Sequence, residues 1–290
     1  MQHTIKNDFI QVQIKEFGAE LCSIQKRDDT LEYIWQGDSK YWKRHSPILF
    51  PIVGKLLDNE YIYKGITYQM MQHGFARDML FKVVAKKENE IIFKLESTTE
   101  TLKVYPFKFE LFVTYKVYNQ TLDIFYKVKN HSLDTMFFSI GAHPAFTWPL
   151  DCIGDKETYY LEFEDTKYLE ILPLTPQGIT LKKEHLLLKN NQLKLHNDLF
   201  KNDALVVNNL QNKLITFKNK TDEKQVKITF DNFPYVGIWS KPQGAPFICL
   251  EPWYGVADLI EHNKKIEEKK GMISLETNGV FESSYQINIS

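Results

Sequence analysis

The stretch FKFELFVTYKVYNQTLDIFYKVKN, residues 107–130, shows the pattern that runs through most of the chain. Apolar and polar side chains alternate from Phe107 to Tyr118 and again from Leu122 to Asn130, with a short polar segment between the two runs. Because successive side chains of a β-strand point to opposite faces, a period of two predicts strands that are buried on one face. The stretch therefore predicts two strands of an antiparallel sheet.

The same alternation recurs along the chain about every 8 to 12 residues, with turn-forming residues between the runs. Further strands are predicted at Phe9–Lys15, Leu21–Gln25, Phe81–Lys87, Glu90–Ser97, Thr135–Ile140, Tyr159–Leu172, Leu214–Asn219, Gln225–Phe230, Tyr235–Ser240 and Phe281–Ile289, with a hairpin at Glu60–Tyr68. Lys182–Asn197 has no clean period and is expected to be irregular, and short helices are expected at Ala257–Glu261 and Lys264–Lys270. Strands at this spacing are typical of a β-sandwich or a β-barrel.

The composition agrees with one large all-β domain. Hydrophobic residues make up 43% of the 290 residues and charged residues 25%, which is ordinary for a globular chain with a sizeable core. Aromatic residues reach 14%, and they fall mostly within the alternating segments, which favours strands over helices. Because no repeat, linker or shift in composition divides the chain, residues 1–290 are expected to form a single domain.

The distribution of charge favours a small ligand over a polymer or a membrane. Basic residues number 36 and acidic residues 37, so the formal net charge is −1, and no basic stripe stands out. Neither a nucleic-acid partner nor a membrane partner is expected. A small molecule that is recognised by local hydrogen bonds fits this balance better.

The cysteines and the N-terminus indicate a cytoplasmic protein. Cys22, Cys152 and Cys249 are an odd number of cysteines, lie far apart and lack metal-type spacing, so they are expected to be reduced thiols. No apolar targeting segment precedes the first strand, and no run of about 18 apolar residues occurs. No metal site, phosphate-binding loop or dinucleotide-binding motif is recognisable, so chemistry without a metal or a cofactor is expected.

A histidine follows one of the predicted strands. The segment Gly141-Ala142-His143-Pro144-Ala145-Phe146 comes directly after Thr135–Ile140, and its small residues leave room around the imidazole. Histidine titrates near neutral pH, and the end of a strand is a rigid position for a catalytic group. The alternative is a histidine that is satisfied within a core or a turn.

A glutamate follows another apolar run. Glu251 comes after Pro246–Leu250 and is followed by Pro252 and Trp253. Burial at the end of such a strand raises the pKa of a carboxyl group and suits it to work as a general base. An ion-paired structural glutamate is the alternative interpretation, and the residues alone leave both open.

A second histidine lies in Gln72-His73-Gly74-Phe75-Ala76-Arg77. Gly74 permits a close backbone approach or a positive φ at this point, and Arg77 offers a planar guanidinium for contacts to an anion. The alternative for Arg77 is an ion pair with Asp78 or with another acidic residue.

These motifs together resemble the aldose 1-epimerase (galactose mutarotase) family over nearly the whole chain. The matching residues are His73-Gly74, the hexapeptide from Gly141 to Phe146, Asp203 and Glu251-Pro252-Trp253. Gln72–Arg77 together with Ile238-Trp239-Ser240-Lys241-Pro242 is similar to the branch of lactose-operon mutarotase-like proteins, close to the hexose-6-phosphate mutarotases. The resemblance implies a large antiparallel β-sandwich with a sugar-binding cleft, and no cofactor.

The resemblance also implies roles for single residues. Glu251 matches the base that takes the proton of the anomeric hydroxyl, His143 matches the acid at the ring oxygen, and His73 matches the histidine that assists there. Asp203 matches a residue that binds sugar hydroxyls. Lys55 stands where the family usually has arginine, and a lysine cannot make arginine's forked contacts. Trp253 and Arg77 are further candidates for binding the substrate.

The function expected from the resemblance is interconversion of the α and β anomers of a free hexose such as galactose or glucose. The nearest alternative is the same reaction on a hexose 6-phosphate, with Arg77, Lys55, Arg44 or Lys241 holding the phosphate. A non-catalytic sugar-binding protein of the same fold is a third hypothesis. A glycosidase that uses Asp203 and Glu251 is a fourth.

Overall fold

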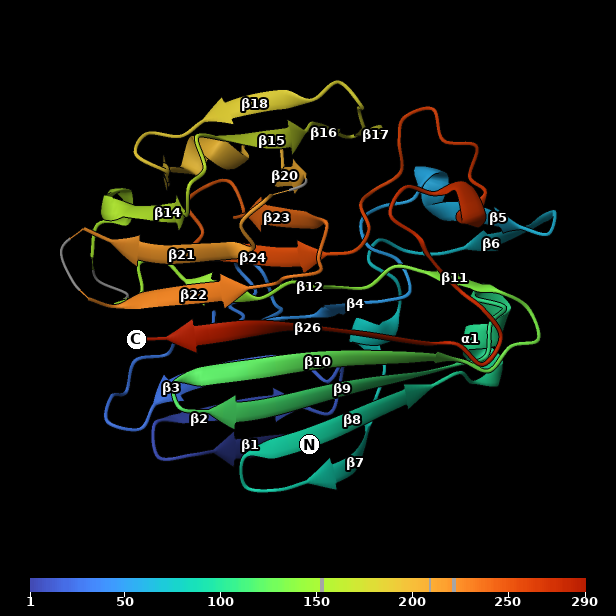
Figure 1. The fold of residues 1–290 in the computed structure, drawn as a ribbon, viewed down its shortest axis with the longest axis horizontal. Helices are drawn as coiled ribbons and strands as arrows, with labels where there is room; N and C mark the ends of the chain where they lie inside the picture. Colours follow the sequence, from blue (N-terminus) through green and yellow to red (C-terminus); the bar gives the residue numbers. More distant parts are fainter. Residues whose placement is uncertain (152–153, 209, 221–222) are drawn as a thin grey trace.

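The computed structural model describes residues 1–151, 154–208, 210–220 and 223–290, and within these ranges two large antiparallel sheets dominate (Figure 1). The first sheet has the order β19 (Gln192–Lys194), β14 (Tyr159–Phe163), β21 (Leu214–Asn219), β22 (Gln225–Thr229), β26 (Val280–Ile289), β10 (Thr121–Asn130), β9 (Phe109–Tyr118), β8 (Glu90–Glu96) and β7 (Lys82–Lys86). The second has the order β18 (Glu184–Leu187), β15 (Tyr168–Leu172), β20 (Leu205–Asn208), β23 (Tyr235–Trp239), β24 (Phe247–Trp253), β12 (Gly141–Ala142) and β4 (Ile48–Leu49). The short strand β13 (Ala145–Thr147) also pairs with β24. The predicted all-β, antiparallel fold class is confirmed.

Smaller elements surround these sheets. The chain begins with a three-stranded sheet, β1 (Gln2–Lys6), β2 (Ile10–Lys15) and β3 (Leu21–Lys26). The two-stranded pairs are β5 (Glu60–Tyr63) with β6 (Ile66–Gln69), β11 (Met136–Phe138) with β25 (Ile273–Leu275), and β16 (Leu174–Thr175) with β17 (Gly178–Ile179). The described helices are α1 (Thr99–Val104) and the 3-10 turns η1 (Leu57–Asn59), η2 (Ala76–Asp78), η3 (Lys156–Thr158), η4 (Asn197–Phe200) and η5 (Ile266–Glu268). None of the helices in the described ranges is long and apolar enough to span a membrane.

The core lies between the two large sheets. Residues 109–130 form the hairpin β9–β10 predicted by their alternation, and every second side chain of each strand is buried. Ile124 of β10 and Ile287 of β26 belong to the same buried cluster as Ile238 of β23 and Leu250 of β24, which come from the second sheet. Burying one such side chain contributes about 1.5–3 kcal/mol. The inward faces of both sheets therefore form one apolar layer.

The segment Tyr159–Leu172 is strand-like, as predicted, but it forms two strands instead of one. The chain reverses between β14 and β15, where Asp165 has a φ of 47°, and the two strands belong to different sheets. Four polar residues, 164–167, make this reversal. The alternating apolar residues on either side concealed the turn.

The prediction that Lys182–Asn197 is irregular is wrong. The segment contains β18 and β19, which lie at the outer edges of the two sheets, and it reverses at Asn190 and Asn191, both of which have positive φ. Edge strands carry many exposed polar side chains. In this segment the exposed lysines obscured the period of two.

The expected helices were only partly found. Ala257–Glu261 is not helical and instead pairs with β17 through a bridge from Leu259 to Ile179, while Lys264–Lys270 contains only the turn η5. The helix α1 was missed, because its capping box joins Thr98 to Thr101 instead of to the more common Glu or Gln. Cys22 and Cys249 are free and buried, as expected, and Cys152 lies outside the described residues.

Candidate active site

A cavity of about 1090 Å³ opens beside strand β24. It is lined by all seven residues that the sequence singled out as candidates for catalysis or substrate binding: Lys55, His73, Arg77, His143, Asp203, Glu251 and Trp253. These residues come from distant parts of the chain, so the fold brings them together. A volume of this size is ample for a small polar ligand.

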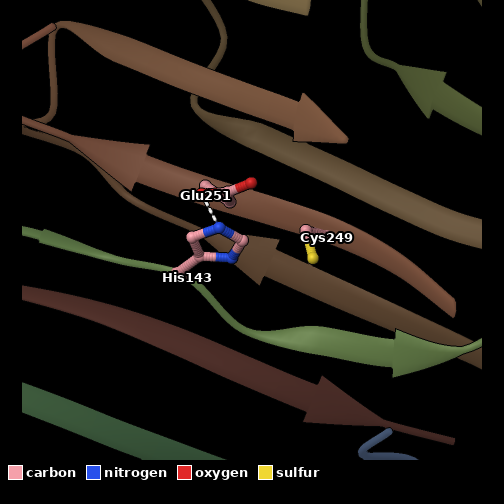
Figure 2. Close-up of side chains that lie close together, drawn as sticks. All are labelled: His143, Cys249 and Glu251. Atoms are coloured by element: carbon pink, nitrogen blue, oxygen red, sulfur yellow. Dashed lines mark ion pairs between the residues drawn. The ribbon is translucent and has the colours of Figure 1, made fainter. Parts of the chain in front are cut away.

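The register of three short strands places His143 opposite Glu251. Gly141 of β12 pairs with Trp253, and Ala145 of β13 pairs with Cys249, so position 143 falls directly across from position 251. Residues that face each other across two antiparallel strands share one side of the sheet. The two side chains therefore meet, with His143 Nε2 3.2 Å from Glu251 Oε2 (Figure 2).

Gly141 is required for this arrangement. A Cβ atom at this position would lie 2.7 Å from Cδ1 of the Trp253 indole, which crosses directly over the glycine. Any larger residue would push the indole away from the cavity wall. Glycine at the start of the hexapeptide thus allows Trp253 to line the cavity together with His143 and Glu251.

Burial favours the uncharged forms of His143 and Glu251. Their side chains are 9% and 1% exposed. Burial raises the pKa of Glu251 well above its ordinary value, and the carboxylate of Asp203 raises it further. Burial lowers the pKa of His143 to about 3, with Arg77 contributing in the same direction. The pair accordingly holds one proton between its two members, and they titrate as a coupled unit.

Hydrogen-bonding groups lie at both ring nitrogens of His73. The N–H of Gly54 donates to its Nδ1 over 3.2 Å, so the neutral imidazole carries its proton on Nε2, which lies 3.2 Å from the side-chain amide nitrogen of Gln72. Burial lowers the pKa of His73 well below its ordinary value, and His143 and Arg77 add to this effect. At neutral pH this ring offers an N–H group rather than a positive charge.

The turn that presents His73 needs glycine at its next position. Gly74 has a φ of 68°, and a Cβ atom there would lie 2.3 Å from the carbonyl oxygen of Phe50. The Arg77 guanidinium closes the same turn by donating from Nη2 to the Gln72 carbonyl over 2.6 Å. These contacts hold the imidazole against the cavity.

Aromatic rings enclose His143 on two sides. The Trp42 ring stacks on the imidazole with a centroid distance of 4.7 Å and an interplanar angle of 28°, and the Trp239 ring meets it edge-on at 5.8 Å. Both indoles also line the cavity. The sequence had marked their segments, the aromatic and basic stretch around Trp42 and the motif from Ile238 to Pro242, but it did not single out these residues as site residues.

The two arginines near the cavity share one carboxylate. Arg44 Nη2 lies 2.9 Å from Asp78 Oδ1, and Arg77 Nε lies 3.7 Å from Asp78 Oδ2. The ion pair that the sequence had offered as the alternative role of Arg77 is therefore present. Lys55 and Asp203, in contrast, are exposed at the cavity.

Asp258, a buried residue outside all the predicted motifs, connects three segments of the cavity wall that contains Lys55, Leu57 and Ile179. Asp258 accepts the N–H of Leu57 at Oδ2, donates its own N–H to the carbonyl of Lys55, and accepts the N–H of Ile179 at its carbonyl, each over 2.9 Å. Its carboxylate pairs with the buried Lys269. No local sequence signal points to this residue, because its partners are far away along the chain.

The chain is similar to known proteins over nearly its whole length. Residues 1–273 match the model of the aldose 1-epimerase family. The plasmid-encoded protein LacX of Lactococcus lactis subsp. lactis is 34% identical over an alignment of 295 positions, which covers 98% of each chain. A galactose mutarotase related enzyme from Lactobacillus acidophilus has a similar structure, with a TM-score of 0.96, 35% identity, and coverage of 100% of this chain and 97% of that one. A galactose mutarotase-like protein from Lactobacillus casei ATCC 334 has a TM-score of 0.92 and 31% identity, with full coverage of both chains.

Proposed function

Because the chain belongs to the aldose 1-epimerase family, we propose that it interconverts the α and β anomers of a free hexose, as one domain over residues 1–290 and without a cofactor. The observation that carries the proposal is the opposition of His143 and Glu251 in a cavity lined by hydrogen-bonding and aromatic groups. Family membership supports an epimerase acting on a sugar, and the choice of substrate and the mechanism are argued from the cavity.

The proposed reaction begins with the ionised Glu251 and the protonated His143. Glu251 takes the proton from the O1 hydroxyl, the C1–O5 bond breaks as the C1=O1 bond forms, and His143 gives its proton to O5. Rotation about the C1–C2 bond turns the other face of the aldehyde toward O5. Closure then returns one proton to O1 from Glu251 and one from O5 to His143, so the enzyme is unchanged.

Burial favours the uncharged form of the pair over the ionised form from which the proposed reaction starts. The ring-opened state leaves both groups uncharged, which is the form that their surroundings favour. His73 supports the same step, because its Nε2–H can donate to an oxygen of the ring without carrying a charge. Holding these groups on paired strands supplies the orientation that proton transfer needs.

The charges around the cavity favour an uncharged sugar. Asp78 pairs with both Arg44 and Arg77, so its carboxylate offsets part of their positive charge near the cavity. Trp253 and the exposed Asp203 supply an apolar surface and an acceptor for hydroxyl groups. One observation favours the hexose 6-phosphate alternative: Lys55 is exposed at the cavity, and within the described part of the chain it forms no ion pair.

Exchange spectroscopy by NMR tests the proposal. The purified protein is added to glucose, galactose and their 6-phosphates, and the rate of α–β exchange is compared with the rate in buffer. We expect faster exchange of the free sugars. Faster exchange of the phosphates alone would establish a hexose 6-phosphate as the substrate. If the protein accelerates the exchange of none of these sugars, the proposed activity is wrong and the hypothesis of a non-catalytic sugar-binding protein is favoured.

A further inference from the structure

A cysteine lies beside the two proposed catalytic groups. Cys249 and Glu251 are two residues apart on β24, so their side chains project from the same face of the strand, and the strand register brings His143 to this face. One donor atom from each of His143, Cys249 and Glu251 lies within 4.8 Å of the other two (Figure 2). We call these three residues the His-Cys-Glu cluster.

The donor atoms of this cluster are those that zinc prefers. Imidazole nitrogen, thiolate sulfur and carboxylate oxygen are the usual ligands of Zn²⁺, and a thiolate disfavours Mg²⁺ and Ca²⁺. The charges also balance, because one thiolate and one carboxylate together offset a divalent cation inside a buried site. Nδ1 of His143 is buried and has no hydrogen-bond partner among the described residues.

One of the three distances already matches a metal site. Bonds of about 2.0–2.3 Å in a tetrahedral arrangement put ligand atoms roughly 3.3–3.7 Å apart. His143 Nε2 and Glu251 Oε2 are 3.2 Å apart, and the separations within the cluster, which reach up to 4.8 Å, have to shorten to this range when a metal binds. His143 and Glu251 line the cavity, so an ion can enter there and keep its fourth position open to water.

We propose that the His-Cys-Glu cluster binds Zn²⁺ or another thiophilic divalent cation in competition with the substrate. The ion forms bonds to an imidazole nitrogen, to the sulfur of Cys249 and to a carboxylate oxygen of Glu251, and the thiol proton of Cys249 passes to the solvent. No electron transfer takes place. The ion occupies the two groups that the proposed proton transfers need, so bound metal stops anomer exchange. This inhibition rests on the proposed function, whereas metal binding itself does not.

Titration of the full chain with Cd²⁺ tests binding directly, because a cadmium–thiolate bond produces an ultraviolet charge-transfer band. The wild type should bind one Cd²⁺ with this band. Cys249→Ser should lose the band, and Glu251→Gln should keep it but bind at least about tenfold more weakly, since even outer contacts of a metal site change affinity by about 10- to 100-fold. Cys22→Ser and Cys152→Ser are the matched controls and should behave like the wild type.

Several results would overturn the site: no band in the wild type, a band that persists in Cys249→Ser, or unchanged affinity in a folded Glu251→Gln. Glu251→Gln keeps all three cysteines, so it tests the metal site even if Cys249→Ser does not fold.

A second experiment measures the rate of anomer exchange with Zn²⁺ and then after addition of a chelator. The rate of each variant is compared with its own rate in the absence of metal. Cadmium binding by a wild type that shows no exchange would refute the proposed function and leave the metal site standing.

Discussion

Asp258 Oδ1 lies 3.0 Å from Lys269 Nζ, and both side chains are only 1% exposed. The ammonium group of Lys269 also donates to the carbonyl of Val256, and the same aspartate holds the backbone of Leu57. Breaking a buried pair leaves one charge without its partner, which is far more costly than losing a surface ion pair. The pair therefore stabilises the wall of the cavity that carries Lys55.

Asp258→Asn should lower the free energy of unfolding by about 3–5 kcal/mol, because the amide leaves the buried ammonium of Lys269 uncompensated. Urea denaturation measures the change. Asp231→Asn is the matched control, since Asp231 is exposed, and it should change stability by no more than about 0.5 kcal/mol. A loss below about 1 kcal/mol in Asp258→Asn would show that the pair contributes little.

Arg77→Ala should lower kcat/KM for glucose and for glucose 6-phosphate by a similar factor. Arg77 pairs with Asp78 and holds the Gln72 carbonyl, so its loss disturbs the turn that carries His73 for both substrates. Steady-state rates with both sugars give the ratio, and Arg27→Ala, an exposed arginine, is the control. A large preference for the phosphate that disappears in Arg77→Ala would contradict our choice of substrate.

His143→Asn should reduce anomer exchange by about 100- to 10,000-fold, because asparagine cannot donate and accept the proton in turn. His185→Asn and His196→Asn serve as controls, since both side chains are exposed and lie away from the cavity. Their rates should stay near that of the wild type. Equal losses in all three variants would point to general destabilisation.

Glu110 should stabilise the fold in a pH-dependent manner. Hydrogen bonds from Lys94 and then His131 lower the pKa of Glu110 to about 2, below its unfolded value. A depressed pKa contributes stability that is present above the unfolded value of about 4.3 and is lost as the pH falls toward the folded value. Glu110→Gln should therefore be less stable than the wild type near neutral pH. The difference in the free energy of unfolding should be smaller when it is measured at about pH 3. Urea midpoints that differ by a constant amount at both pH values would argue against this role.

The local pattern predicted the strands well, because a period of two survives wherever one face is buried, as in residues 109–130. It failed where edge strands expose polar side chains, as in β18 and β19, and where a short polar turn separates two apolar runs, as between β14 and β15. The first failure is a missed pair of strands and the second is a missed turn, and in each case the two strands belong to different sheets. A local pattern carries little information about which sheet a strand joins.

The site was predictable to a similar degree. Seven of the residues that line the cavity could be named from their motifs, but the opposition of His143 to Glu251 depends on the pairing of β12 and β13 with β24. Asp258 had no signal at all, because its contacts with Leu57, Ile179 and Lys269 exist only in the folded chain. The proximity of Cys249 to His143 likewise follows from the strand register.

The most direct test of the proposed function is the rate of anomer exchange in Glu251→Gln. Glutamine keeps the shape of the side chain but cannot accept the O1 proton, so exchange of a free hexose should fall by about 100- to 10,000-fold. Circular dichroism should confirm that the variant stays folded. If folded Glu251→Gln exchanges the anomers at a rate near that of the wild type, Glu251 is not the base and the proposed mechanism is wrong.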